Sequence, residues 1–274
     1  MKGRVLIIPG MVALVLSALG CGCGGIDIAT VRFGEPRAVR GSGEVKTEER
    51  QVNDFTGVEL ATLGKLTIKL GEQEQLSIEA EDNLLEYFEV EVRGQVLRIT
   101  NRDGVTIRNR RPVNYYLTVK ELDDIRISSS GDVEAPDLEA ERFSVFISSS
   151  GDLDMGDLRA STLQVRISSS GDVQMGTLHA DRIEVDITSS GDLDIAGGEV
   201  EKQDISLTSS GEYRARNLAS DEAEVRLSSS GSATIQVRDY LQANLSSSGD
   251  LHYIGQPTVN TSTSSSGDVR QVSD

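Results

Sequence analysis

Residues 143–175 read FSVFISSSGDLDMGDLRASTLQVRISSSGDVQM, and this stretch contains one pattern twice. A corner sequence, Ser-Ser-Ser-Gly-Asp or a near copy, occurs eight times in the chain, and its glycines are separated by 20, 20, 20, 20, 20, 18 and 18 residues. Because units of constant length indicate stacked structural repeats, this spacing predicts a solenoid. The eight glycines are Gly131, Gly151, Gly171, Gly191, Gly211, Gly231, Gly249 and Gly267.

Apolar and polar residues alternate within each unit. Before the corner at Gly151, Phe143, Val145 and Ile147 point to one side of the chain, and after it Leu153 resumes the same set. A period of two is expected of β-strands. Each unit is therefore predicted to contain two short strands that are bent at the corner sequence.

The length of the unit fits one turn of a coil. A strand advances about 3.3 Å per residue, so a 20-residue unit traces at most about 66 Å, which closes around a narrow core. We predict an all-β fold, a right-handed parallel β-helix with 18–20-residue coils stacked about 4.8 Å apart. A second corner is expected at residues 157–160. Antiparallel hairpins that turn at Ser-Gly, forming a β-sandwich, are the alternative.

Stacked coils would place equivalent residues in columns. The inward column through the corner strands is expected to contain Ile147, Ile167, Ile187, Leu207 and Leu227. We predict that the solenoid domain spans residues 50–274, with less regular coils at 50–120 and the repeats at 121–274.

The N-terminus has the features of an export signal. Lys2 and Arg4 precede an apolar stretch at residues 5–19, which is short for a membrane-spanning helix. The run that ends at Cys21 resembles a bacterial lipobox, so we predict a lipoprotein signal peptide at 1–20, lipid attachment at Cys21 and a tether at 21–49. Modification at Cys23, or an ordinary secretory signal, remains an alternative.

Composition and charge restrict the partners. The net charge of −17 repels nucleic acid. Neither cysteine is followed by Asp, a pattern that resembles lipoproteins sent to the outer membrane. We therefore expect a cell-envelope protein that contacts the membrane through its lipid anchor, binds a glycan or a protein, and does not bind nucleic acid.

The repeats and the residues before them resemble the head GIN domain family, which is described as "putative auto-transporter adhesin". The resemblance implies a β-helix-like fold in a secreted or envelope protein. The family usually has Gly-Ser-Gly at each corner, where this chain has Ser-Ser-Gly. The residues that carry the resemblance are Gly41–Gly43, Arg50, Val52, Phe55, residues 65–70, 76–80 and 113–119, the Ser-Gly-Asp coils, Tyr253, Gly255 and Pro257.

Backbone structure explains the corner sequence without a ligand. Glycine is expected to adopt a positive φ at the sharp corner. The acids that follow it would form an outward column in which each side chain points into water or caps its own turn; Ca²⁺ binding is the alternative. The column contains Asp132, Asp152, Asp172, Asp192, Glu212, Asp250 and Asp268, interrupted by Ser232.

We predict a non-catalytic binding module with no cofactor and no metal. The chain has only His179 and His252, on different coils, and it lacks a nucleophile elbow and a phosphate loop. A polysaccharide lyase-like enzyme and a purely structural envelope protein are the alternatives. Arginines are expected on solvated faces and tyrosines at the edges of the core, with sugar stacking as the alternative for the tyrosines. These residues are Arg159, Arg166, Arg182, Arg214, Arg216 and Arg226, and Tyr115, Tyr116, Tyr240 and Tyr253.

Overall fold

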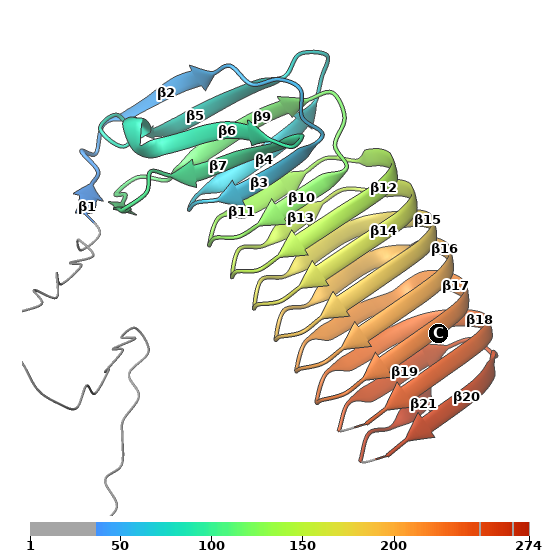
Figure 1. The fold of residues 1–274 in the computed structure, drawn as a ribbon. Helices are drawn as coiled ribbons and strands as arrows, with labels where there is room; N and C mark the ends of the chain where they lie inside the picture. The colour runs from blue at the N-terminus through green and yellow to red at the C-terminus, as the bar shows by residue number, and fades with distance from the viewer. Residues whose placement is uncertain (1–36, 247, 265, 274) are drawn as a thin grey trace, which may run out of the picture. The chain divides into compact units, whose positions relative to one another are not determined.

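The computed structural model describes residues 37–246, 248–264 and 266–273, which form coils stacked along one axis beneath an N-terminal cap (Figure 1). All strand pairs from β10 to β21 are parallel, so the predicted parallel β-solenoid is confirmed and the antiparallel sandwich is wrong. The strands of this coil stack are β10 (Asp124–Ile127), β11 (Asp132–Ala135), β12 (Leu138–Ile147), β13 (Leu153–Met155), β14 (Leu158–Ile167), β15 (Val173–Ile187), β16 (Leu193–Leu207), β17 (Glu212–Leu227), β18 (Ser232–Leu245), β19 (Asp250–Ile254), β20 (Thr258–Thr263) and β21 (Val269–Gln271).

The inward columns are those that the sequence predicts. Ile147 pairs with Ile167, Ile167 with Ile187, and the column continues through Leu207 and Leu227. All five side chains are at most 1% exposed. One coil buries its apolar face only against its neighbours, so the core is a continuous strip along the axis.

Each coil has three sides, where the sequence predicts two strands. The first side runs up to the corner sequence (residues 142–147 in one coil), the second side follows it (residues 153–155), and the third side comes next (residues 158–160). Alternation changes phase between Ala160 and Leu163, which are both buried, and the Cα pairing skips the position between Ala160 and Thr162. The inward phase therefore shifts by one residue at a third bend.

The corner glycines are required for space, so the predicted positive φ is wrong. None of them is among the described glycines with positive φ. A Cβ atom on Gly171 would collide with the carbonyl oxygen of Gly151 and lie 2.9 Å from Ile147 Cγ2. Gly151 and Gly191 make the same approach to the coil before them, so the three glycines stack in one line as expected. The corners approach one another too closely for any side chain.

The N-terminal cap covers residues 37–120 and contains antiparallel pairs. β2 pairs with β5, β5 with β9, and β6 with β7 in antiparallel orientation. The first described strand, β1, begins at Arg37 and pairs with β8, and β2 begins at Val45, so both strands start inside the segment 21–49 predicted to be a tether. The cap elements are β1 (Arg37–Arg40), β2 (Val45–Arg50), β3 (Gly57–Ala61), β4 (Lys65–Leu70), β5 (Gln75–Glu81), the 3-10 helix η1 (Leu85–Tyr87), β6 (Phe88–Arg93), β7 (Val96–Asn101), β8 (Val105–Arg108) and β9 (Asn114–Val119).

Chain order and spatial order differ in the cap. β3 lies between β7 and β10, and β4 lies between β9 and β11, all in parallel pairs. The segment 57–70 therefore forms the layer next to the repeats, and the chain then passes outward to build β7 and β9 before it returns to β10. This crossing places the antiparallel strands over the N-terminal end of the core.

A buried polar network accompanies the change from 20- to 18-residue coils. Gln203 and Ser220 are fully buried, and Gln203 Nε2 donates to the Ser220 hydroxyl at 3.0 Å and to the Leu218 carbonyl at 3.3 Å. The buried Tyr213 hydroxyl donates to Gln203 Oε1 at 2.9 Å. The pairing of β17 with β18 shifts register on both sides of Ser220. These side chains satisfy backbone groups that a regular ladder would pair.

Two inward positions of the last described coil are polar, whereas the coils before it have apolar residues there. In register, Ala243 is followed by Thr261 and Leu245 by Thr263. Every residue of β20 is exposed. Because a terminal repeat leaves one side unpaired, polar inward positions suit this end of the stack.

Candidate binding groove

A shallow groove of about 800 Å³ runs along the third side over four coils and ends at Asp221 of a fifth. Its floor is a column of small side chains in register, Ala140, Ala160, Ala180 and Val200. Since alanine projects only a methyl group, the flanking side chains stand above it. The hollow therefore follows from a small residue at the same position of successive coils.

The walls of the groove are mainly acidic. One wall continues in register through Glu139, Arg159, His179 and Glu199. The other wall follows the third bend and is formed by Glu141, Ser161, Asp181, Glu201 and Asp221. Six carboxylates face one basic side chain in this lining, so the groove favours positive charge.

Arg238 joins the two walls at one end. Its guanidinium lies 2.6 Å from Glu199 Oε1 on one wall and 3.2 Å from Asp221 Oδ1 on the other. The hydrogen bonds that Arg238 donates to these two carboxylates, Glu199 first, raise its pKa. The arginine shows that a cation fits between the walls at the height of the carboxylates.

Towards the cap, the hollow continues. A second depression of about 500 Å³ shares Glu139, Ala140 and Glu141 with the groove and extends it to Glu121 and Arg142. Together the two depressions follow the third side from the cap to Arg238. This length suits an extended partner better than a compact one.

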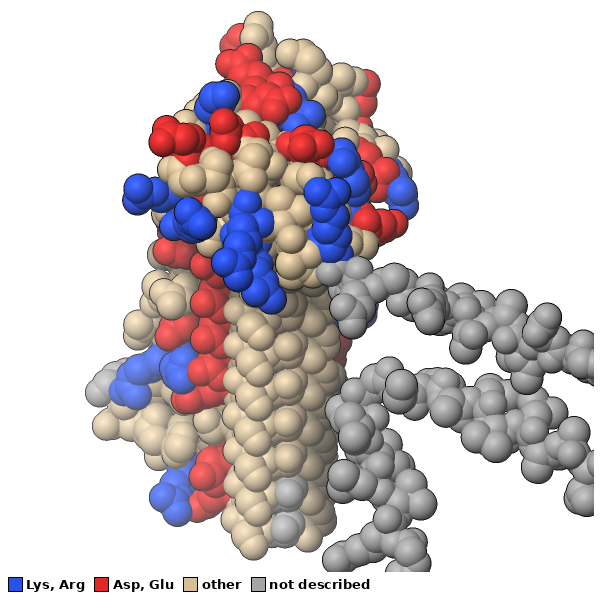
Figure 2. All heavy atoms as spheres, turned by 90° about the vertical axis from the view of Figure 1, so that its left-hand side faces the viewer, with Lys and Arg blue, Asp and Glu red and all other residues tan. Residues whose placement is uncertain are grey.

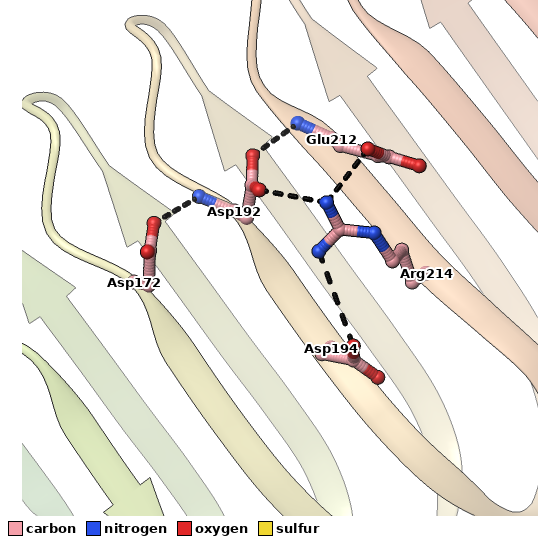
Figure 3. A network of polar contacts seen from close by, with 5 residues as sticks. All are labelled: Asp172, Asp192, Asp194, Glu212 and Arg214. Atoms are coloured by element: carbon pink, nitrogen blue, oxygen red, sulfur yellow. Dashed lines mark hydrogen bonds and ion pairs between the residues drawn. The ribbon is translucent and has the colours of Figure 1, made fainter.

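The predicted outward column of acids lies on the second side, where Figure 2 shows it beside the uncharged corners. Five of these carboxylates, those of Asp132, Asp152, Asp172, Asp192 and Asp250, accept the backbone N–H of the equivalent residue in the next coil. Asp192 N–H donates to Asp172 Oδ1 at 2.8 Å, and Glu212 N–H donates to Asp192 Oδ1 at 2.9 Å (Figure 3). This inter-coil cap differs from the expected role, in which each side chain points into water or caps its own turn.

Arg214 sits within this acidic column. Its guanidinium contacts Asp192 Oδ2 at 2.9 Å, Glu212 Oε2 at 2.7 Å and Asp194 Oδ2 at 3.9 Å (Figure 3). Burial opposes the charge of Arg214, but the hydrogen bonds that it donates to Glu212 and Asp192 outweigh burial and raise its pKa. Among the residues with described positions, no group of three or more His, Cys, Asp or Glu could hold a metal ion.

The structure separates most of the other candidate residues. Arg159 and His179 lie together in the groove, whereas His252 is on the second side. Arg166, Arg182 and Arg226 form ion pairs with Asp186, Asp204 and Glu224, and Arg216 donates to the Ser273 carbonyl. Tyr115 is buried, Tyr116 and Tyr240 are exposed, and Tyr253 packs against the core.

Cys21 and the signal peptide lie outside the described residues. No helix in the described part of the chain is long and apolar enough to cross a membrane. The groove lining was missed from the sequence, although a signal exists. A small residue between polar neighbours recurs every 20 residues, as in Glu139-Ala-Glu141, Arg159-Ala-Ser161 and His179-Ala-Asp181.

The fold defines a parallel β-solenoid protein, and comparison with known families specifies it further. The family described as "Putative auto-transporter adhesin, head GIN domain" matches twice, at residues 54–177 and 156–257. These matches cover more than half of the chain, so the chain belongs to this family. The resemblance predicted from the sequence is therefore confirmed. No curated protein matches the chain.

Three solved structures show the same fold. A protein from Parabacteroides distasonis, titled a "putative lipid binding protein", is 23% identical with a TM-score of 0.79, and the match covers 86% of this chain and 100% of that one. A "putative adhesin" from Parabacteroides merdae is 21% identical (TM-score 0.78; 86% and 99% covered), and one from Bacteroides fragilis is 20% identical (TM-score 0.66; 85% and 100% covered).

Proposed function

We propose that this protein is a non-catalytic lipoprotein of the bacterial cell envelope that binds an extended, positively charged partner in the groove, as an adhesion or scaffolding module. The family description supports a surface or envelope role. The observation that carries the proposal is the groove, whose floor is in register and whose lining holds six carboxylates from successive coils. Extended concave surfaces are the usual binding faces of solenoids.

The length and charge of the groove define the partner. Coils repeat about every 4.8 Å, so carboxylates on one wall are spaced to meet cations along a linear chain. Arg238 already occupies this position between Glu199 and Asp221. A protein segment or other polymer that carries amines or guanidinium groups has the required chemistry.

Polylysine is a direct probe of this site. The triple variant Glu141→Gln, Asp181→Asn, Glu201→Gln is expected to bind polylysine about ten-fold more weakly, because exposed ion pairs contribute up to about 1 kcal/mol each. The control Asp103→Asn, Asp154→Asn, Glu222→Gln removes the same charge elsewhere and should bind nearly as the wild type does. Equal weakening by both variants would mean general attraction to an acidic protein and would reject the groove.

A carbohydrate-active enzyme is the alternative, because Arg159 and His179 are adjacent in the groove. The surrounding carboxylates repel the uronic acids that lyases cleave. We expect no product from acidic or neutral polysaccharides. Turnover that is lost in Arg159→Ala would support the enzyme instead.

The proposed attachment to the membrane depends on a lipid at Cys21. We expect the mature chain to begin with a lipidated Cys21 and the Cys21→Ser variant to lose the lipid mass. Mass spectrometry of the mature N-terminus measures this directly. An unmodified, soluble chain that starts beyond Cys23 would contradict lipid anchoring.

A further inference from the structure

The charge of the protein is divided unevenly between the cap and the coil stack. Residues 37–120 contain 13 basic and 14 acidic side chains, whereas residues 121–274 contain 11 basic and 28 acidic ones. The coil stack therefore has a net charge of −17, and the cap is close to neutral. Basic residues that gather on the cap are consequently the main site where this protein can attract anions.

Lysines and arginines gather on the cap above the uncharged corners (Figure 2). Arg40 and Arg108 are direct partners in the parallel pair of β1 and β8. Arg110 and Arg111 follow within three residues of the end of β8, and all four are exposed. We call these four side chains the basic cluster.

A buried carboxylate holds the backbone beneath the basic cluster. Glu81 is fully buried, and its oxygens accept the N–H groups of Gly43 at 2.6 Å, Arg110 at 2.7 Å and Arg111 at 3.3 Å. Both segments that carry the arginines are thus fixed to one side chain. Three backbone N–H groups satisfy this carboxylate, and it forms no ion pair with any of the four guanidinium groups, although the nearby charge of Arg110 contributes to the lowering of its pKa.

The guanidinium groups of the basic cluster have no ion-pair or hydrogen-bond partner among the residues that the structure describes. Other arginines of the protein do pair, including Arg50, Arg98 and Arg102 in the same cap. Four adjacent unpaired arginines repel one another, so this arrangement has a cost unless an anion neutralises it.

The position of the cluster indicates which anion it meets. Arg40 is on the first described strand, and only fifteen residues separate Cys21 from Arg37. Such a segment spans at most about 50 Å when fully extended. In the proposed lipoprotein, the cluster therefore stays within reach of the bilayer that holds the lipid.

We propose that the basic cluster binds the anionic headgroups of the membrane in which the protein is anchored. Each Lys or Arg near an anionic bilayer adds attraction that decays within a Debye length. Contact through the cluster would turn this edge of the cap to the lipid surface and leave the acidic third side free for a partner. The inference rests on the proposed lipid anchoring, but binding by the basic cluster can be measured on a fragment that has no lipid.

The test uses residues 37–274. Every buried hydrophobic side chain of the described residues lies between Val52 and Ile254. A solved structure that matches 86% of this chain does so over 100% of its own length. We therefore expect residues 37–274 to fold alone. Sedimentation with vesicles of phosphatidylcholine, or of equal parts phosphatidylcholine and phosphatidylglycerol, should show binding only to the anionic vesicles. Binding should decline as salt is raised.

Two matched variants assign the binding. Changing Arg40, Arg108, Arg110 and Arg111 to Gln should weaken binding to anionic vesicles at least about ten-fold. The control, with Gln at Lys69, Arg93, Arg142 and Arg270, has the same net charge and should lose less than about two-fold. Equal loss in both variants, no preference for anionic vesicles, or tighter binding to double-stranded RNA than to vesicles would each overturn the proposal. A negative result would not bear on lipidation at Cys21, because the tested fragment, residues 37–274, does not contain that cysteine.

Discussion

The corner glycines of the coil stack and Gly104 of the cap are required for different physical reasons, and the difference illustrates how each region is specified. In the coil stack, Gly171 is limited by space, because the carbonyl of Gly151 occupies the position of a Cβ atom. In the cap, Gly104 has a φ of +73° with open space around it. A repeated array thus encodes close packing at one position of every coil, whereas the cap depends on constraints that occur once.

Gly171→Ala is expected to have the largest effect. The new methyl group forces two corners apart, at a cost of about 2–3 kcal/mol in the free energy of unfolding. Gly104→Asn should change it by less than about 0.5 kcal/mol, since Asn tolerates positive φ. Thermal unfolding followed by circular dichroism measures both. Equal costs for the two substitutions would remove the distinction between the regions.

Glu81→Gln tests the cap. Burial disfavours its charge, but the backbone N–H groups of Arg110, Arg111 and Gly43 outweigh this and hold the pKa of Glu81 below its ordinary value. A lowered folded pKa stabilises the protein above the unfolded value of about 4.3, and this stability is lost as pH falls through the folded pKa. The variant should lose about 1–2 kcal/mol at pH 7. Urea unfolding at pH 7 and pH 3 should show a smaller difference between variant and wild type at the lower pH.

A buried tyrosine in each region gives a paired comparison. Tyr213→Phe leaves Gln203 Oε1 without its 2.9 Å bond and should cost about 1–2 kcal/mol, whereas Tyr115→Phe removes a longer 3.3 Å bond to Leu63 and should cost about 0.5 kcal/mol. Burial raises the pKa of both hydroxyls, so neither should ionise in alkaline titration before the protein unfolds. A larger cost at Tyr115 would reverse the comparison.

The acidic column should give the smallest effect. Asp172→Asn keeps the Oδ1 acceptor for Asp192 N–H and removes one of several neighbouring negative charges. We expect a change within about 0.5 kcal/mol, while Asp172→Ala should cost about 0.5–1 kcal/mol. Chemical denaturation at low and high salt separates the two. A large loss in Asp172→Asn would mean that the charge itself holds the coils together.

The coil stack could be predicted from the sequence because the corner sequence recurs eight times at nearly constant spacing, which chance does not produce. Its third side was missed, although the three-residue step from Ala160 to Leu163 breaks the alternation and marks the bend. The cap was not predictable in the same way. Nothing in the residues of β3 indicates that it pairs with β10 and β7, since those registers depend on distant segments that occur once. The groove lies on the third side, so a prediction that lacked this side could not include the groove.

The two threonines of the final coil have a consequence for how such proteins change length. Thr261 and Thr263 end two of the apolar columns, so a coil added beyond them would meet two hydroxyl groups and keep only the column of Leu241 and Val259. Duplication of an inner coil, by contrast, preserves every neighbour relation and lengthens the rod by about 4.8 Å. Evolution can therefore extend the molecule from the middle while both ends stay as they are.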